Sequence, residues 1–132
     1  MRVLTIRQPW AYAILELGKD VENRSWWTDY RGPLVIHSSA RPEPLINLDP
    51  YISEAVMSRL DDNEMALGAI LGVVDLVDCT EDSRSKWADD PDDAWHWILE
   101  NPRKLAKPIP CKGRLGFWPV PLIALDALKR LR

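Results

Sequence analysis

The most informative segment of the chain is Lys19-Asp-Val-Glu22-Asn-Arg24-Ser-Trp-Trp-Thr-Asp-Tyr30-Arg-Gly-Pro-Leu-Val-Ile-His37. Its first half places two cations around one carboxylate, as Lys19, Glu22 and Arg24. Its second half becomes apolar. The glycine and proline at positions 32 and 33 are typical of a turn, and residues 33–38 are typical of a buried strand. We therefore expect a charged loop that leads into a strand of the core.

Apolar residues recur at strand and helix spacing along the rest of the chain. The spacing predicts strands at residues 2–6, 69–79, 94–100 and 115–120, and helices at 10–17, 50–60 and 121–131. Pro9 and Gly18 stand where the first helix begins and ends, and Gly72 permits a bend in the long strand 69–79. The acidic segment 81–93 is expected to form an exposed loop, and the proline-broken segment 102–110 a connection.

These elements favour an α+β fold. Five to six strands of mixed direction, interrupted by helices and strong turn signals, predict a small sheet curled into a partial β-barrel with helices packed at its ends. A doubly wound parallel sheet is less favoured, because it requires regular strand–helix alternation and usually a glycine-rich first turn. The final helix is expected to bury the leucines at positions 122, 125, 128 and 131. With 132 residues and 46% hydrophobic content, residues 1–132 are predicted to form one domain.

Four ordered blocks of the sequence resemble one family of small domains. Lys19-x-x-Glu22-x-Arg24 is similar to most of the G-x-K-x-x-E-x-R signature of the ASCH family, although the glycine stands one residue later, at Gly18. The other blocks are Ile6-Arg-Gln-Pro-Trp10, Tyr30-Arg-Gly-Pro-Leu-Val-Ile-His37, and Asn101-Pro-Arg103 with Pro110-Cys-Lys-Gly113. The resemblance implies a free-standing, prokaryotic-type ASCH domain with a PUA-like barrel. It also implies that RNA or a modified nucleotide binds in a cleft between barrel and helices.

The residues expected to bind the ligand are basic, acidic and aromatic. They are Lys19, Glu22, Arg24, Ser25, Trp26, Arg31, Lys112 and Arg114. Lys19 and Arg24 suit a phosphate and a second planar acceptor. Glu22 can accept a hydrogen bond from a base amine, or it can hold the two cations in an ion-pair network that only fixes the loop. Lys112 and Arg114 suit backbone-phosphate contact, or they are ordinary turn residues.

Aromatic side chains offer a stacking platform for a base. Neighbouring residues of an extended segment point to opposite faces, so one of Trp26 and Trp27 is expected in the core. We expect Trp26 to lie near the site and to stack on an unpaired base. Trp10 lies on the apolar stripe of its helix and is expected in the core. His37 is either a satisfied core histidine or, if it opens into the cleft, a general acid or base.

Three functions are compatible with these residues. The favoured one is a module that binds single-stranded RNA or a nucleotide. The second is a metal-independent hydrolase of RNA or a modified nucleoside, since the resemblance extends to an amidohydrolase of acetylated cytidine and to a ribonuclease. Lys19 and Glu22 would then be catalytic, with His37 as a further possibility, although those amidohydrolases carry a threonine nucleophile where Glu22 stands. The third is a protein-interaction domain of the coregulator type.

Charge is distributed unevenly along the chain. Residues 1–41 contain six Lys or Arg against four Asp or Glu, residues 42–101 contain three against fifteen, and residues 102–132 contain eight against one. If the two chain ends meet, their basic groups would form a positive face that the net charge of −3 hides. Ordinary solvated charge around an acidic middle segment is the alternative.

The cysteines and the hydropathy of the chain predict the compartment in which the protein resides. Cys79 and Cys111 are expected to be reduced thiols, and together with His37 and His96 they lack the paired spacing of a zinc site. No metal and no cofactor are expected. The chain lacks both the apolar run of about 20 residues that a bilayer requires and a targeting segment. We therefore expect a cytoplasmic protein without a membrane partner.

Overall fold

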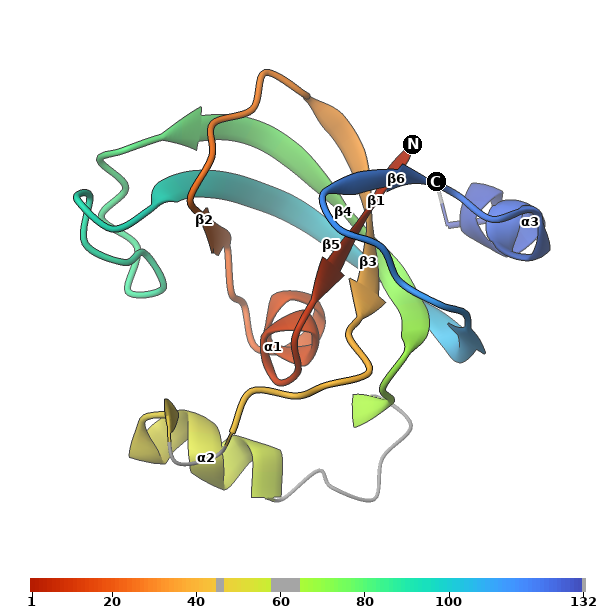
Figure 1. The fold of residues 1–132 in the computed structure, drawn as a ribbon, viewed down its shortest axis with the longest axis horizontal. Coiled ribbons are helices and arrows are strands. Elements are labelled where there is room, and N and C mark those ends of the chain that lie inside the picture. The colour runs from red at the N-terminus through yellow and green to blue at the C-terminus, as the bar shows by residue number, and fades with distance from the viewer. Residues whose placement is uncertain (45–46, 58–64, 132) are drawn as a thin grey trace.

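In the computed structural model, which describes residues 1–44, 47–57 and 65–131, one mixed sheet dominates the fold. Its strands are β1 (Arg2–Ile6), β2 (Val21–Arg24), β3 (Gly32–Ser38), β4 (Ala69–Thr80), β5 (Trp95–Pro110) and β6 (Phe117–Pro119). Their order is β2-β5-β4-β3-β1-β6. β1 runs parallel to β3, and the other neighbouring strands are antiparallel. The sheet curls into a half-barrel (Figure 1), which confirms the α+β partial-barrel prediction.

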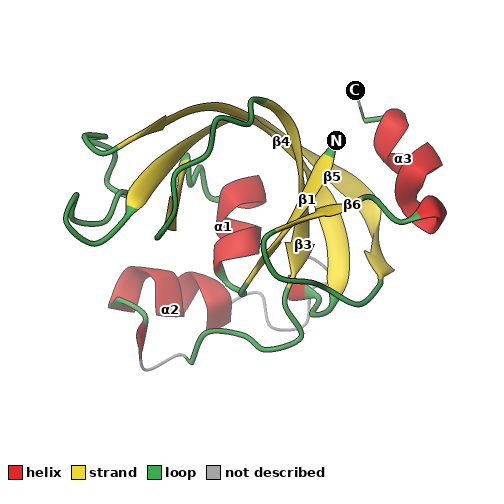
Figure 2. Ribbon diagram, turned by 45° about the horizontal axis from the view of Figure 1, so that its top comes forward, coloured by secondary structure: helices red, strands yellow, loops and turns green. Residues whose placement is uncertain are grey.

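The helices lie on opposite sides of this sheet. Helix α1 (Trp10–Glu16) lies inside its curve, whereas the 3-10 turn η3 (Leu122–Ala124) and helix α3 (Leu125–Lys129) lie outside it, as Figure 2 shows. Helix α2 (Pro50–Met57) lies at the open end beside α1. The predicted end of this helix, at residue 60, lies outside the described residues. Among the helices that the structure describes, none has the length and apolarity needed to cross a bilayer.

Strand β4 is central and bent at Gly72, as expected. A Cβ atom at Gly72 would lie 2.3 Å from the main-chain oxygen of Arg103 on β5, so no larger residue fits at this position. The pairing of β4 with β5 shifts register between Ile70 and Gly72. The missing side chain therefore allows β5 to approach closely at the point where the sheet bends.

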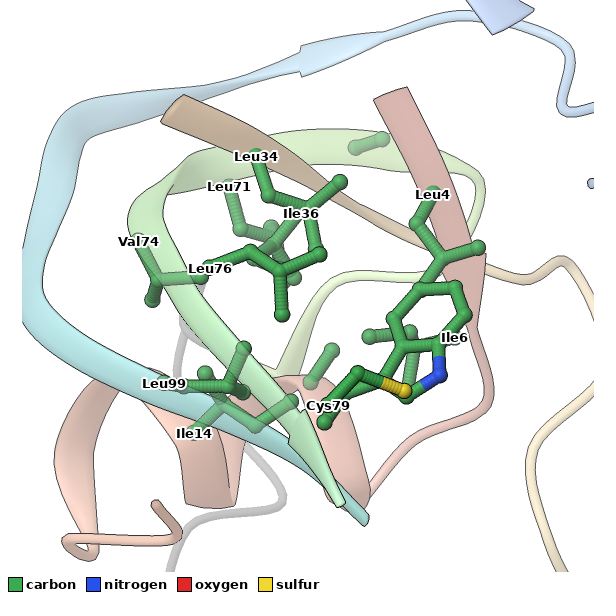
Figure 3. Packing of buried hydrophobic residues seen from close by; sticks show 13 residues of the cluster. Leu4, Ile6, Ile14, Leu34, Ile36, Leu71, Val74, Leu76, Cys79 and Leu99 are labelled. Atoms are coloured by element: carbon green, nitrogen blue, oxygen red, sulfur yellow. The ribbon is translucent and has the colours of Figure 1, made fainter. Parts of the chain in front are cut away.

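The core consists of two layers, one on each face of the sheet. Leu4 and Ile6 point into the curve toward Ile14 of α1 (Figure 3), while Val3 points outward to pack with Leu128 of α3. Successive side chains of a strand point to opposite faces of the sheet, so a strand that is apolar throughout contributes to both layers. The inner layer positions the site, because it fixes α1 and the loop that follows it against the sheet.

Two predictions near the C-terminal end were wrong. The segment 102–110 continues β5 instead of connecting elements. Its prolines are tolerated because β2 pairs only with residues 95–98, which leaves one side of β5 unpaired by the described strands beyond that point. The expected leucine stripe is also broken, since Leu122 is 85% exposed whereas Leu128 is fully buried. The chain starts this segment as a 3-10 turn, which rotates Leu122 away from the buried side.

Candidate functional site

Lys19, Glu22 and Arg24 meet in one buried ion-pair cluster. Lys19 Nζ donates to Glu22 Oε1 at 3.2 Å and also to the main-chain oxygen of Val21. Arg24 Nε and Nη2 lie 3.0 and 2.9 Å from the other oxygen, Glu22 Oε2. Lys19 is only 5% exposed and Glu22 only 7%. Each oxygen of the carboxylate is thus held by a different cation, and the cluster retains one formal positive charge.

Local sequence explains this geometry. Gly18 adopts a positive φ of 74° directly after α1, so the chain turns sharply and brings Lys19 back toward β2. Glu22 and Arg24 are two residues apart on β2, and they therefore share a face. The shift of the signature glycine to position 18 leaves the ion-pair cluster intact.

One surface hollow beside the cluster is lined by tryptophan. This tryptophan pocket has a volume of about 310 Å³ and is formed by Trp10, Lys19, Glu22, Asn23, Asp49, Lys86, Trp87 and Asp89. Asn23 holds one wall in place, because its side chain donates to the Trp87 carbonyl at 3.0 Å and accepts from the Asp89 amide at 2.9 Å. The acidic segment 81–93 thereby supplies one side of the pocket, which its composition alone did not indicate.

Two further hollows are lined by cations. The arginine pocket, of about 400 Å³, is formed by Thr5, Ile6, Arg7, Trp10, Glu22, Arg24, Ser39, Arg114, Leu115 and Gly116. The loop pocket, of about 390 Å³, is formed by Thr5, His37, Ser39, Ala40, Arg41, Gly68, Cys111, Lys112, Gly113, Arg114 and Leu115. Trp10 and Glu22 are shared with the tryptophan pocket, and Arg114 is shared by the two cationic pockets. The three hollows are therefore neighbours, and we refer to them together as the groove.

Comparison with known proteins identifies the family of this domain. A family model described as the ASCH domain matches residues 4–109. The chain belongs to the ASCH family. Activating signal cointegrator 1 of Homo sapiens is 31% identical over 124 residues, which cover 87% of this chain and 21% of that protein. The Mus musculus protein of the same name is 30% identical over the same coverage. The chain thus spans about a fifth of the length of these curated relatives.

Other residues expected at the site of this ASCH domain lie elsewhere. Arg31 donates to the main-chain oxygens of Thr28 and Tyr30, both at 2.9 Å, and its Nη2 lies 3.7 Å from Asp78. Arg31 and the exposed Ser25 are absent from the lining of the three hollows. Lys112 and Arg114 do line the groove. The structure therefore brings five of the eight expected residues to the groove.

Trp26 occupies the core position of the tryptophan pair, contrary to our expectation. Its ring packs edge-on against Trp97 and Phe117, with centroid distances of 4.6 and 5.2 Å. Trp27 is 51% exposed but does not line the three hollows. The register of the segment after β2 directs Trp26 into the curve of the sheet, and neither residue lines the groove.

His37 is buried and fully hydrogen-bonded. The Trp118 indole donates to Thr5 Oγ1, which lies 3.1 Å from His37 Nδ1, and His37 Nε2 lies 2.8 Å from the Cys111 carbonyl. Because that carbonyl can only accept, Nε2 carries the proton and the Thr5 hydroxyl donates to Nδ1. Burial lowers the pKa of His37, and the hydrogen bond to Cys111 partly opposes this effect. His37 is thus a neutral core histidine whose edge reaches the loop pocket.

Several residues line the groove although the sequence did not predict them there. Trp10 is only partly buried and lines two hollows, and Lys19 Nζ lies 5.8 Å from the centre of its ring. Trp87, Arg7 and Arg41 also line the groove. The position of Trp10 at the first turn of α1, next to the signature loop, was the one available signal for it. The remaining residues reach the groove through contacts between distant segments.

Metal ions in proteins are held by groups of His, Cys, Asp or Glu side chains. Within residues 1–44, 47–57 and 65–131, no three His, Cys, Asp or Glu side chains lie close enough together to hold an ion. Cys79 and Cys111 are free thiols. Burial raises the pKa of the Cys111 thiol, although a hydrogen bond to the main chain of Ile70 partly opposes this shift. The groove is lined by cations, carboxylates and indoles, and the loop pocket also contains His37, Cys111 and two hydroxyl side chains.

Proposed function

We propose that this ASCH domain binds single-stranded RNA, or a nucleotide of the same chemistry, in the groove. The observation that carries the proposal is the charge of the arginine and loop pockets. Five cationic side chains line these two pockets: Arg7, Arg24, Arg41, Lys112 and Arg114. Glu22 is the single carboxylate in their linings, and both of its oxygens already accept from Lys19 and Arg24. Such a groove attracts the phosphates of a nucleic-acid backbone.

The tryptophan pocket supplies the contacts for a base. Trp10 and Trp87 both pack against the small apolar cluster of Leu48 and Ile52, so the two indoles are supported from behind. Stacking of a base on an aromatic side chain is tolerant of sequence and suits an unpaired strand. The volume of about 310 Å³ falls at the lower end of the range of small-ligand sites. A strand would place one base here and run its phosphates along the two cationic pockets.

The state of Glu22 favours binding over hydrolysis. A general base must be within reach of the proton that it abstracts. Here the carboxylate is 7% exposed, and each oxygen is engaged by a cation. Glu22 acts best as the anion that fixes Lys19 and Arg24 at the junction of two pockets.

A binding titration tests the proposal. Fluorescence polarisation of a labelled single-stranded RNA would be measured with the parent and with the Lys112→Ala, Arg114→Ala double variant. The matched control is Lys129→Ala, Arg130→Ala, which removes the same charge from the outer helix α3 and its end. We expect the first double variant to bind at least roughly tenfold more weakly, and the control to bind like the parent. Equal affinity of both double variants would contradict the proposal.

A further inference from the structure

The loop of residues 111–116 exposes a leucine in the middle of the cationic groove. Leu115 is 99% exposed, and it lines both the arginine pocket and the loop pocket. Its neighbour Arg114 lines the same two pockets. Exposure alone would carry no argument, since Leu122 of η3, which lines none of the three hollows, is 85% exposed. The position of Leu115 between two cationic hollows is what distinguishes it.

This loop is held firmly from below. His37 donates to the Cys111 carbonyl at 2.8 Å, and His37 is itself fixed by Thr5 and the Trp118 indole. Gly113 presses onto the same residues, because a Cβ atom there would lie 2.8 Å from both His37 Cε1 and Thr5 Oγ1. The loop is therefore preorganised, with its base packed on the buried histidine.

The far end of the loop is fixed by backbone geometry. Gly116 has a φ of +64°, a conformation that favours glycine, and β6 begins at the next residue. Since β6 pairs with β1, the chain after Leu115 is anchored to the same strand that carries Thr5. The loop is thus anchored on both sides of Leu115, so we expect this side chain to keep its position when a ligand enters the groove.

We propose that Leu115 is a wedge that inserts between two neighbouring bases of the bound RNA. The inference rests on the proposed RNA-binding function and deepens it, because it predicts a base step that is opened on binding. Apolar side chains that separate stacked bases are a known means of bending nucleic acid. The neighbouring cations suit this role, since Lys112 and Arg114 line the same pocket as Leu115 and can contact phosphates next to the opened step. Insertion would also remove the fully exposed leucine from water.

The test uses a single-stranded, adenine-rich RNA with one 2-aminopurine, whose fluorescence rises when it loses its stacked neighbour. A set of such strands carries the probe at successive positions. With the parent protein, we expect fluorescence at saturation to rise at one position more than at the others. Leu115→Ala should abolish this local rise and weaken affinity roughly tenfold, whereas Leu115→Met should restore both. Leu122→Ala is the matched control and should behave like the parent.

The possible outcomes separate the two proposals. If the parent binds RNA but the fluorescence pattern is the same in Leu115→Ala, the wedge is wrong and the binding function stands. If Leu122→Ala lowers the local signal as much as Leu115→Ala, the effect is general and the wedge is again wrong. If the parent does not bind RNA, both proposals are overturned.

Discussion

Arg24 donates a hydrogen bond from Nη2 to the main-chain oxygen of Thr5 at 3.0 Å. Arg24 ends β2 at one edge of the sheet, and Thr5 lies on β1 near the opposite edge. The guanidinium therefore bridges the gap that the half-barrel leaves open, while its Nε and the same Nη2 also contact Glu22. Arg24 thus lines the arginine pocket and also links the two edges of the half-barrel. Experiments must therefore separate the effect of this residue on binding from its effect on stability.

Glu22→Ala should destabilise the domain more than loss of an exposed ion pair. The substitution leaves Lys19 and Arg24 without their shared carboxylate in a largely buried site. Unpaired buried charges are costly, and we expect the free energy of unfolding to fall by about 3 kcal/mol. Urea denaturation measures this loss.

Glu43→Ala provides the control for the Glu22 substitution. Glu43 pairs with Arg7 at 3.4 Å, and the Arg7 side chain is 57% exposed. Exposed pairs contribute less than about 1 kcal/mol. If Glu22→Ala were no more destabilising than Glu43→Ala, the buried cluster would not hold the loop.

The stability of the domain should decrease as the pH falls below neutrality, partly because of His37. Burial lowers the pKa of His37 in the folded state. An unfolded histidine titrates near pH ~6.5, so below that value the unfolded chain binds a proton that the folded chain does not, and the free energy of unfolding decreases. Chemical denaturation of the parent and His37→Gln at several pH values tests this. The variant should lose stability less steeply, and parallel curves would refute the assignment.

Trp87→Ala should weaken RNA binding if the tryptophan pocket holds a base. Loss of one stacking contact is worth about 1–3 kcal/mol, or roughly five- to 150-fold in affinity. Trp27→Ala is the comparison, because Trp27 is 51% exposed yet outside the groove lining. The RNA affinities of the two variants are compared by fluorescence polarisation, after each variant has been shown to be folded. A larger effect from Trp27 than from Trp87 would place the base elsewhere.

The ion-pair cluster is one of two alternatives for Lys19, Glu22 and Arg24, and it could be considered from the sequence because its residues are local. Lys19, Glu22 and Arg24 lie within six positions, next to the helix end at Gly18. The sequence predicts a loop for the charged segment, whereas residues 21–24 form β2 by pairing with the distant strand β5. The spacing of apolar residues likewise predicted β1, β3 and β4 close to their observed bounds. Local rules therefore sufficed for these three strands and for the choice of the charged residues, but not for β2.

The remaining parts depend on contacts between distant segments. Whether Trp26 or Trp27 is buried depends on which side of the extended segment faces the curve of the sheet. Adjacent side chains point to opposite sides, so a shift of one residue would exchange the two tryptophans. Arg7 lines the arginine pocket, and Arg41 and Lys112 line the neighbouring loop pocket, because β3 pairs with β1 and the chain returns to β1 through β6. The continuation of β5 through three prolines depends on its unpaired side, which is a property of the sheet.

The salt dependence of RNA binding shows whether the cationic side chains of the groove contact phosphates. Affinity of the parent for a single-stranded RNA would be measured over a series of salt concentrations, and then repeated with Lys112→Ala, Arg114→Ala. If these side chains contact phosphates, the logarithm of the association constant should fall linearly with the logarithm of salt concentration. The magnitude of the slope should decrease by about 1.4 in the variant, at about 0.7 per phosphate contact. An affinity of the parent that does not change with salt, or identical slopes for the two proteins, would contradict binding along the cationic groove.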